Sequence, residues 1–201
     1  MTLTRNISTC IKLKDISFSY ENNILEHFSL SIPISGRTAL LAPSGWGKTT
    51  LLFLIAGLLK PENGEIIYPI RNPQFSMVFQ ENRLIENASI KRNLTLVQNQ
   101  LTTTQLQAHL DAVGLNYPPA QKVRNLSGGE KRRLSILRAL YADYDILLLD
   151  EPFTGLDEDT KQKVITHILQ ETEGKTVILV THNVWEAQAL QCDIVQLTSA
   201  Q

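Results

Sequence analysis

Apolar and polar positions alternate along residues 11–34, and this pattern predicts β-strands near the start of the chain. The apolar positions of the two runs are Ile11, Leu13, Ile16, Phe18 and Tyr20, then Phe28, Leu30 and Ile32. The polar segment Glu21-Asn22-Asn23 separates the runs and suits a turn. We therefore expect a small antiparallel β region here.

Short apolar runs further along the chain predict buried strands, and helical patterns follow them. The predicted strands are residues 38–41, 75–79, 146–149 and 176–180. Uniformly apolar runs of this length are typical of parallel strands that are covered on both faces. Three helices are predicted. The first begins at Lys48 and stops near Lys60-Pro61, the second spans Asp157–Glu173, and the third spans Val184–Gln191. The expected fold is therefore α/β with a mostly parallel sheet.

Residues 80–141 have a different character from the rest of the chain. They are polar and rich in Gln, Asn and Thr, with helical spacing at Leu106, Leu110 and Val113 before Gly114. We interpret this region as a mostly helical lobe inserted into the sheet. Residues 1–201 then form a single domain, with a core of residues 1–79 and 142–201 and a lobe of residues 80–141.

Composition and charge argue against some classes of function but do not identify one. The 201 residues are 43% hydrophobic and 19% charged with a net charge of −1, so nothing points to nucleic acid or to an anionic membrane. The longest apolar run, Leu51–Leu59, is well short of the ~20 residues that cross a bilayer, and the first residues lack the layout of a signal peptide. Cys10 and Cys192 lie far apart, which favours two buried thiols in a cytosolic chain.

The strongest chemical signal is the segment Ala42–Thr50, which follows a predicted strand and opens a predicted helix. It resembles the G-x-x-x-x-G-K-[ST] phosphate loop, in which backbone N–H groups and a helix N-terminus bind phosphate oxygens. Lys48 is placed to reach the β- and γ-phosphates, and the Thr49 hydroxyl to bind Mg²⁺. Two residues depart from the pattern: Ala42 replaces the first glycine, which would strain the loop at positive φ, and Trp46 is bulky.

Two carboxylates end the predicted strand 146–149. Ligands of open α/β sheets lie outside the carboxyl ends of the strands, so Asp150 is placed to hold Mg²⁺ and Glu151 to orient or deprotonate a water. We expect the phosphate loop to follow a neighbouring strand.

A second anion site is predicted where Ser127-Gly128-Gly129 precedes a helical run to Tyr141, because small residues at a helix N-terminus leave its N–H groups accessible. The following cluster Lys131-Arg132-Arg133 is interpreted as a solvated helix face with no role in nucleic-acid binding.

With these residues in place, the sequence resembles the nucleotide-binding subunits of ABC transporters over nearly its whole length. Leu126–Glu130 resembles the family signature, with Glu130 where glutamine is commoner, and Gly155-Leu156-Asp157 resembles the D-loop. The resemblance also covers single residues of three further motifs: Tyr20 for adenine stacking, Gln80 for the Q-loop and His182 for the switch histidine. Asn183 stands where aspartate is usual.

The resemblance implies a P-loop NTPase that binds and hydrolyses ATP with Mg²⁺. Catalytic roles fall to Lys48, Gln80, Glu151 and His182, and metal binding to Thr49, Gln80 and Asp150. The nucleotide would contact Tyr20, Ser44, Gly45, Trp46, Gly47, Lys48, Thr49, Thr50, Gln80 and Asp150. It also implies a head-to-tail dimer with itself or a paralogous subunit, in which Ser127, Gly128 and Gly129 of one subunit close on the ATP of the other.

The leading functional hypothesis is the ATPase subunit of a transporter, peripheral on the cytoplasmic side of the membrane. The segment Gln80–Ile85 and the region Val180–Ala189 resemble nitrate, sulfonate and taurine importer subunits. By the same analogy, a separate permease would dock near residues 81–95. The alternatives are a soluble ABC ATPase that does not transport, such as an Fe–S assembly type, and a subunit that binds but poorly hydrolyses ATP.

Overall fold

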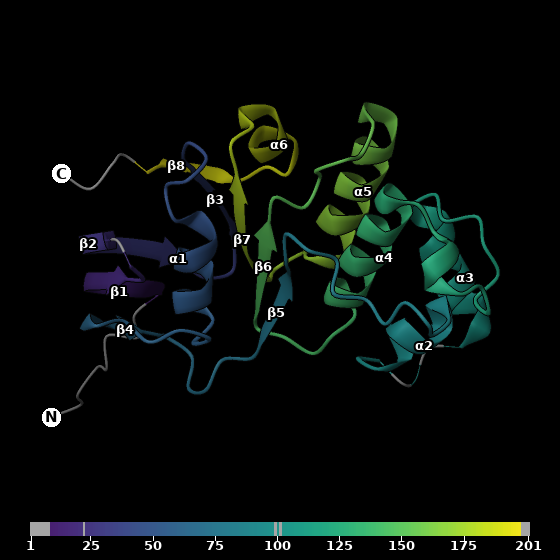
Figure 1. Ribbon diagram of the computed structural model, residues 1–201, viewed down its shortest axis with the longest axis horizontal. Helices are drawn as coiled ribbons and strands as arrows, with labels where there is room; N and C mark the ends of the chain where they lie inside the picture. Colours follow the sequence, from purple (N-terminus) through teal and green to yellow (C-terminus); the bar gives the residue numbers. More distant parts are fainter. Residues whose placement is uncertain (1–8, 22, 99, 101, 198–201) are drawn as a thin grey trace, which may run out of the picture.

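The computed structural model describes residues 9–21, 23–98, 100 and 102–197, so Asn22 of the predicted turn and the first residues lie outside it. A three-stranded antiparallel sheet has the order β2-β1-β4, with bounds Cys10–Ser19 (β1), Asn23–Pro33 (β2) and Asn63–Ile67 (β4). It lies at the left of Figure 1, beside α1 (Lys48–Ile55). The predicted antiparallel region is confirmed, and β4 is a further strand of it. β4 was not predicted because it begins with the exposed polar residues Asn-Gly-Glu.

The second sheet has five parallel strands in the order β5-β6-β7-β3-β8. Their bounds are Arg37–Leu41 (β3), Phe75–Val78 (β5), Ile146–Asp150 (β6), Thr176–Thr181 (β7) and Asp193–Gln196 (β8). The α/β class is confirmed, but the phosphate loop does not follow a neighbour of β6. β7 lies between β6 and β3, so the residue after β7 lies at the same end of the sheet as the loop and the two carboxylates.

Each central strand buries both of its faces, and successive side chains enter different cores. Leu147 and Leu149 of β6 join a core with α4 (Gly128–Leu140) and α5 (Glu158–Glu171). Ile146 and Leu148 join a second core with α1 and the antiparallel sheet. This burial on both faces explains why β6 and β7 are uniformly apolar.

Three shorter elements and α4 follow β5 and precede β6 in the chain. They are α2 (Ile90–Thr95), α3 (Thr103–Ala112) and the 3-10 helix η1 (Val123–Asn125), and with α4 they gather at the right of Figure 1. A capping box between Thr102 and Gln105 begins α3. The division of the chain into a core and an inserted lobe of residues 80–141 stays a prediction.

Several element ends differ from the predicted ones. α1 ends at Ile55 rather than near Lys60, because Gly57 adopts a φ of 69° and the Leu58 N–H turns back to the Phe53 carbonyl. α6 (Val184–Ala189) is shorter than predicted. The prediction of two buried thiols is wrong, since Cys10 and Cys192 are both half-buried, although burial raises the pKa of Cys192 to about 12. Within the described residues, every helix is too short or too polar to span a bilayer.

Candidate active site

The phosphate loop connects β3 to α1 and depends on a glycine at its last turn. Gly47 has a φ of 101°, and a Cβ atom on it would lie 2.5 Å from Cγ2 of Ile24 at the start of β2. Only glycine therefore fits there. Among the described residues, no side chain caps the N-terminus of α1. Its first N–H groups and partial positive charge are thus available to an anion.

The two departures from the loop pattern do not distort it. Ala42 is not among the described residues with positive φ, so the strain considered from the sequence does not arise. It packs instead into the core beneath the loop, where its side chain is 3% exposed. Trp46 packs edge-on against Phe28 of β2, with ring centroids 5.5 Å apart. Its side chain therefore covers the antiparallel sheet rather than the inside of the loop.

The Lys48 ammonium lies inside the loop and faces a carboxylate. Its Nζ donates hydrogen bonds to the carbonyls of Ala42, at 2.9 Å, and Pro43, at 3.0 Å. The Oε1 atom of Glu151 lies 3.8 Å away. The ammonium is thus a preorganised cation where β3, α1 and β6 meet.

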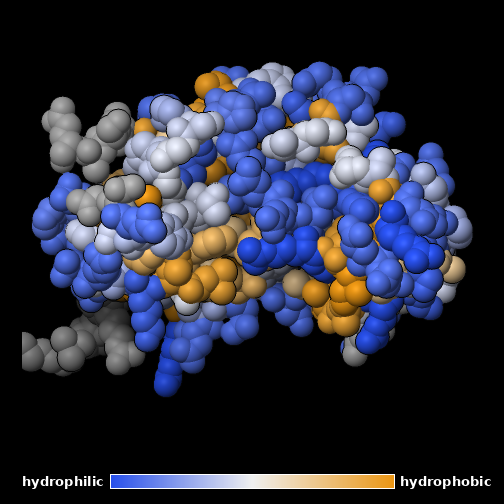
Figure 2. Space-filling model, viewed as in Figure 1, coloured by the Kyte–Doolittle hydropathy of each residue, from blue (hydrophilic) through white to orange (hydrophobic). Residues whose placement is uncertain are grey.

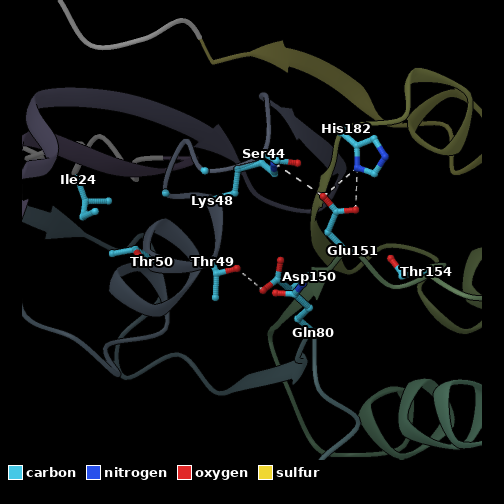
Figure 3. Close-up of a pocket in the computed structure, with 12 residues that line it drawn as sticks. Ile24, Ser44, Lys48, Thr49, Thr50, Gln80, Asp150, Glu151, Thr154 and His182 are labelled. Carbon is cyan, nitrogen blue, oxygen red and sulfur yellow. Dashed lines mark hydrogen bonds and ion pairs between the residues drawn. The ribbon is translucent and has the colours of Figure 1, made fainter. Parts of the chain in front are cut away.

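Thr49 and Asp150 bring oxygen atoms together across the sheet. The Thr49 hydroxyl donates a 2.7 Å hydrogen bond to Oδ2 of Asp150 (Figure 3). Burial raises the pKa of Asp150, although the Thr49 hydrogen bond works in the opposite direction. A hydroxyl and a carboxylate are hard oxygen donors that suit Mg²⁺, so the residues present fit this ion.

Glu151 holds an uncommon backbone conformation at the centre of the site. Its φ is 46°, which costs a non-glycine residue on the order of 1–3 kcal/mol unless its surroundings fix it. Its N–H donates to the Val180 carbonyl on β7 at 2.9 Å. Nδ1 of His182, which directly follows β7, lies 2.9 Å and 3.1 Å from the two carboxylate oxygens of Glu151. The backbone and the histidine together aim this carboxylate at the loop.

These residues line one pocket of about 530 Å³, a size typical of ligand sites. The predicted residues that line it are Ser44, Gly45, Gly47, Lys48, Thr49, Thr50, Gln80, Asp150, Glu151 and His182. Figure 3 shows Lys48 and Thr49 facing Glu151 and Asp150, with His182 beside Glu151. Two further lining residues, Ile24 and Thr154, were not predicted from the sequence. The signal for Thr154 is its place in the turn after Glu151, whereas nothing local marks Ile24.

Other predicted residues do not line this pocket. Trp46 lies against Phe28, as described above. Tyr20 is 60% exposed, and its ring meets the edge of Phe18 at a centroid distance of 5.0 Å. The segment Ser127–Gly129 lies at the start of α4, where Ser127 and Gly128 are exposed.

The start of α4 is closed by a capping box between Ser127 and Glu130. The Ser127 N–H donates to Glu130 at 2.8 Å, and the Ser127 hydroxyl accepts from the Glu130 N–H at 3.3 Å. Burial works to raise the pKa of Glu130, but its hydrogen bonds from Ser127 and Tyr117 outweigh burial and lower it. Glutamate therefore serves here as an anionic helix cap.

Arg132 overturns the interpretation of Lys131-Arg132-Arg133 as a solvated face. Its side chain is 3% exposed and donates only to backbone carbonyls. The acceptors are the carbonyls of Phe79, Gln80, Asp150, Glu151 and Pro152. Burial lowers the pKa of Arg132, while Asp150 and Glu151 act to raise it. The guanidinium thus joins the ends of β5 and β6 and fixes the backbone that carries Gln80 and Glu151.

Arg132→Lys should slow ATP hydrolysis while leaving much of the fold intact. Lysine keeps the charge but cannot span carbonyls from two strand ends with one planar fork. Arg132→Ala should lower the free energy of unfolding by about 3 kcal/mol or more, because several buried carbonyls lose their donor. The measurements are urea unfolding and the steady-state ATPase rate.

Lys131→Ala is the matched control for Arg132, since it removes the neighbouring side chain. Lys131 forms a 2.7 Å ion pair with Glu86, whose side chain is 59% exposed. Because the Glu86 carboxylate of this pair is open to solvent, the pair contributes about 1 kcal/mol at most. Equal effects of Lys131→Ala and Arg132→Ala would show that Arg132 does not position the strand ends.

Comparisons with known proteins agree with this geometry. The family model described as ABC transporter matches residues 25–154, more than half of the chain. The chain belongs to the ABC transporter family. The predicted resemblance to the nucleotide-binding subunits of ABC transporters is therefore confirmed, and the chain is an ATPase of this family.

Relatives from three bacteria are similar over most of the chain. The thiamine import ATP-binding protein ThiQ of Aliivibrio fischeri is 33% identical over 90% of this chain and 83% of its own length. The taurine import ATP-binding protein TauB of Roseobacter denitrificans is 37% identical over 83% and 67%. The aliphatic sulfonates import ATP-binding protein SsuB 1 of Paracoccus denitrificans is 37% identical over 94% and 80%.

A solved structure shares the fold of this ABC chain. The ATP-bound structure of a bacterial Atm1-family ABC exporter superposes with a TM-score of 0.84 at 22% identity. The match covers 99% of this chain and 38% of the exporter chain. At this identity the likeness confirms the fold alone.

Proposed function

We propose that this chain is the ATP-hydrolysing subunit of an importer and drives a separate membrane permease from the cytoplasmic face. The observation that carries the proposal is the convergence of Lys48, Thr49, Asp150, Glu151 and His182 on one pocket. The relatives that support import are ATP-binding proteins for thiamine, taurine and aliphatic sulfonates.

The phosphate loop binds the triphosphate in this proposal. The N–H groups at the start of α1 and the Lys48 ammonium donate to its oxygens, and Thr49, Asp150 and Gln80 would hold Mg²⁺. When bound, the ion would neutralise charge on the β- and γ-phosphates. Tyr20, 60% exposed, offers a ring face on which adenine stacks.

Glu151 acts on the attacking water. Its carboxylate orients a water molecule and takes its proton as the water oxygen bonds to the γ-phosphorus. The bond between the γ-phosphorus and the oxygen that bridges to the β-phosphate breaks, and ADP carries that oxygen away. His182, bonded to Glu151 through Nδ1, keeps the carboxylate in position. Lys48 stabilises the charge that develops on the phosphoryl oxygens.

A second subunit completes the site in this scheme. Ser127 and Gly128 are exposed at the start of α4 and lie outside the pocket of their own chain. The Gly128 N–H and the Ser127 hydroxyl are placed to meet the γ-phosphate held by another copy or by a paralogous subunit, whereas the Ser127 N–H is bonded to Glu130. ATP then stabilises the closed pair, and hydrolysis removes that bridge.

The permease is proposed to dock on a groove beside residues 81–95. The groove has a volume of about 470 Å³, and its apolar lining includes Leu58, Phe75, Met77, Phe79 and Val97. Figure 2 shows apolar side chains gathered over the regions of α1 and α2, with hydrophilic ones between them. The Arg83 guanidinium stacks 3.8 Å from the Phe79 ring centroid, which joins the groove to the 81–95 segment. A short amphipathic helix of a permease is the occupant that such an apolar groove with a polar rim suits.

Leu58→Glu should separate transport from ATP hydrolysis. Leu58 is 59% exposed and lines the groove, so the carboxylate should block an apolar partner without disturbing the core. Affinity purification of the wild-type chain from solubilised native membranes should recover a membrane-spanning protein whose recovery falls about tenfold or more in Leu58→Glu. The ATPase rate of the isolated chain should stay within about twofold.

Ile194→Glu is the matched control, because Ile194 is 42% exposed on β8 and lies outside the groove. Its variant should retain the membrane partner. Recovery of no membrane-spanning protein by the wild-type chain would favour the soluble, non-transport alternative. Equal recovery by Leu58→Glu would place the docking surface elsewhere.

A further inference from the structure

His109, His167 and Glu171 form a cluster of metal-ligating side chains that the ATPase mechanism does not use. One potential ligand atom from each residue lies within 4.8 Å of those of the other two. Within the described part of the chain, this is the one group of three or more histidine, cysteine, aspartate or glutamate residues with such a spacing. It lies between α3 and α5, away from the residues that line the nucleotide pocket.

The backbone brings these ligands together before any ion binds. His167 and Glu171 are four residues apart on α5 and therefore share one helix face. His109 belongs to the last turn of α3, which packs against α5. The ring centroids of His109 and His167 are 5.8 Å apart. Binding thus requires adjustment of side chains but no rearrangement of helices.

Tyr141, at the end of α4, orders both histidines. Its hydroxyl oxygen lies 2.7 Å from Nε2 of His167, and its ring lies against His109 with centroids 4.3 Å apart. His167 is also buried, with 4% of its surface exposed. The bond to Nε2 leaves Nδ1 of His167 for an ion, and a hydrogen bond to the other ring nitrogen orients the imidazole of a metal site.

The ligand set selects one class of ion. Two imidazoles and one carboxylate match the three-ligand sites of Zn²⁺, in which water fills the fourth position. Mg²⁺ and Ca²⁺ prefer oxygen donors throughout, so the ion that serves ATP does not compete well here. Ligand atoms of a tetrahedral zinc site lie about 3.3 Å apart, which the present atoms reach by small side-chain rotations.

We propose that His109, His167 and Glu171 bind a zinc-class transition-metal ion that ties α3 to α5. α3 precedes β6 in the chain, whereas α5 follows it, so the ion links two segments that are separated in sequence by the strand ending in Asp150. An ion that binds only the folded chain adds to its stability by mass action. The site therefore couples the availability of a trace metal to the packing of these helices.

The test uses the purified full chain, stripped of metal and nucleotide and kept in excess Mg²⁺. Zn²⁺ is titrated in competition with a chromophoric chelator, and Co²⁺ serves as a spectroscopic probe because tetrahedral and octahedral sites differ strongly in visible absorption. We expect one Zn²⁺ per chain, a tetrahedral Co²⁺ spectrum and a higher Tm with Zn²⁺. Glu171→Gln keeps the shape of the side chain, and His109→Ala removes a half-buried ligand; each should weaken Zn²⁺ binding at least tenfold.

The other two histidines of the chain provide matched controls. His27→Ala and His182→Ala should each leave Zn²⁺ affinity within about twofold of the wild type. Loss of binding in His182→Ala alone would place the ion beside Glu151 and overturn the proposal. Unchanged binding in both Glu171→Gln and His109→Ala, or no Zn²⁺ bound at micromolar concentration, would do the same and leave the cluster as a Tyr-His packing contact.

Discussion

Glu151→Gln should lower the rate of ATP hydrolysis by roughly 10²–10⁴-fold, the usual loss when a general base is removed. Glutamine keeps the shape of the side chain but cannot take a proton from water. Affinity for ATP should not fall, because the substitution removes a negative charge that lies 3.8 Å from the Lys48 ammonium and repels phosphate. The measurements are phosphate release at saturating Mg·ATP and nucleotide binding by fluorescence titration.

Glu158→Gln is the matched control for this variant. Glu158 begins α5 and its side chain is 72% exposed. The rate should stay within about twofold of the wild type. If Glu151→Gln hydrolyses ATP at the normal rate, another group activates the water.

Lys48→Ala should weaken ATP binding by roughly 10–100-fold, which corresponds to losing a charge-assisted hydrogen bond to phosphate. The variant also leaves the carbonyls of Ala42 and Pro43 without their donor, so the loop itself should loosen. ADP should lose less affinity than ATP, because Lys48 is assigned to the γ- as well as the β-phosphate. Titration with ATP and ADP in excess Mg²⁺ checks both expectations.

Lys14→Ala controls for the loss of one positive charge. Lys14 pairs with Glu65 on the antiparallel sheet, and both side chains are more than half exposed. Its nucleotide affinity should match that of the wild type. Equal ATP affinity in Lys48→Ala and the wild type would show that the loop is not the phosphate site.

Much of the site could be predicted because most of its functional residues lie in short continuous segments of the sequence. A phosphate loop must combine glycine, lysine and a hydroxyl in adjacent positions, and Gly47, Lys48 and Thr49 do so. Asp150 and Glu151 follow a uniformly apolar strand, so their place at the sheet edge follows from the pattern. The two sheets were also predictable from local patterns. A strand buried on both faces is a continuous apolar run, and a strand buried on one face alternates apolar and polar residues.

The remaining features depend on contacts between distant segments. Arg132 stands in a basic run that suggests exposure, and only the three-dimensional structure shows the carbonyls that surround it. The order β6-β7-β3 depends on which crossover the chain takes, and no local period records it. Ile24 lines the pocket because Gly47 approaches it closely, which is a property of two segments rather than one. β8 is an edge strand with exposed Asp193 and Ile194, so it lacks the apolar signal of its neighbours.

The central claim is that ATP bound between the phosphate loop and Glu151 joins two subunits until it is hydrolysed. Sedimentation analysis of Glu151→Gln with Mg·ATP and with Mg·ADP tests it most directly, because this variant should hold ATP without consuming it. We predict a dimer with ATP and a monomer with ADP. The same association state with both nucleotides would contradict the claim, since the γ-phosphate would then bridge nothing.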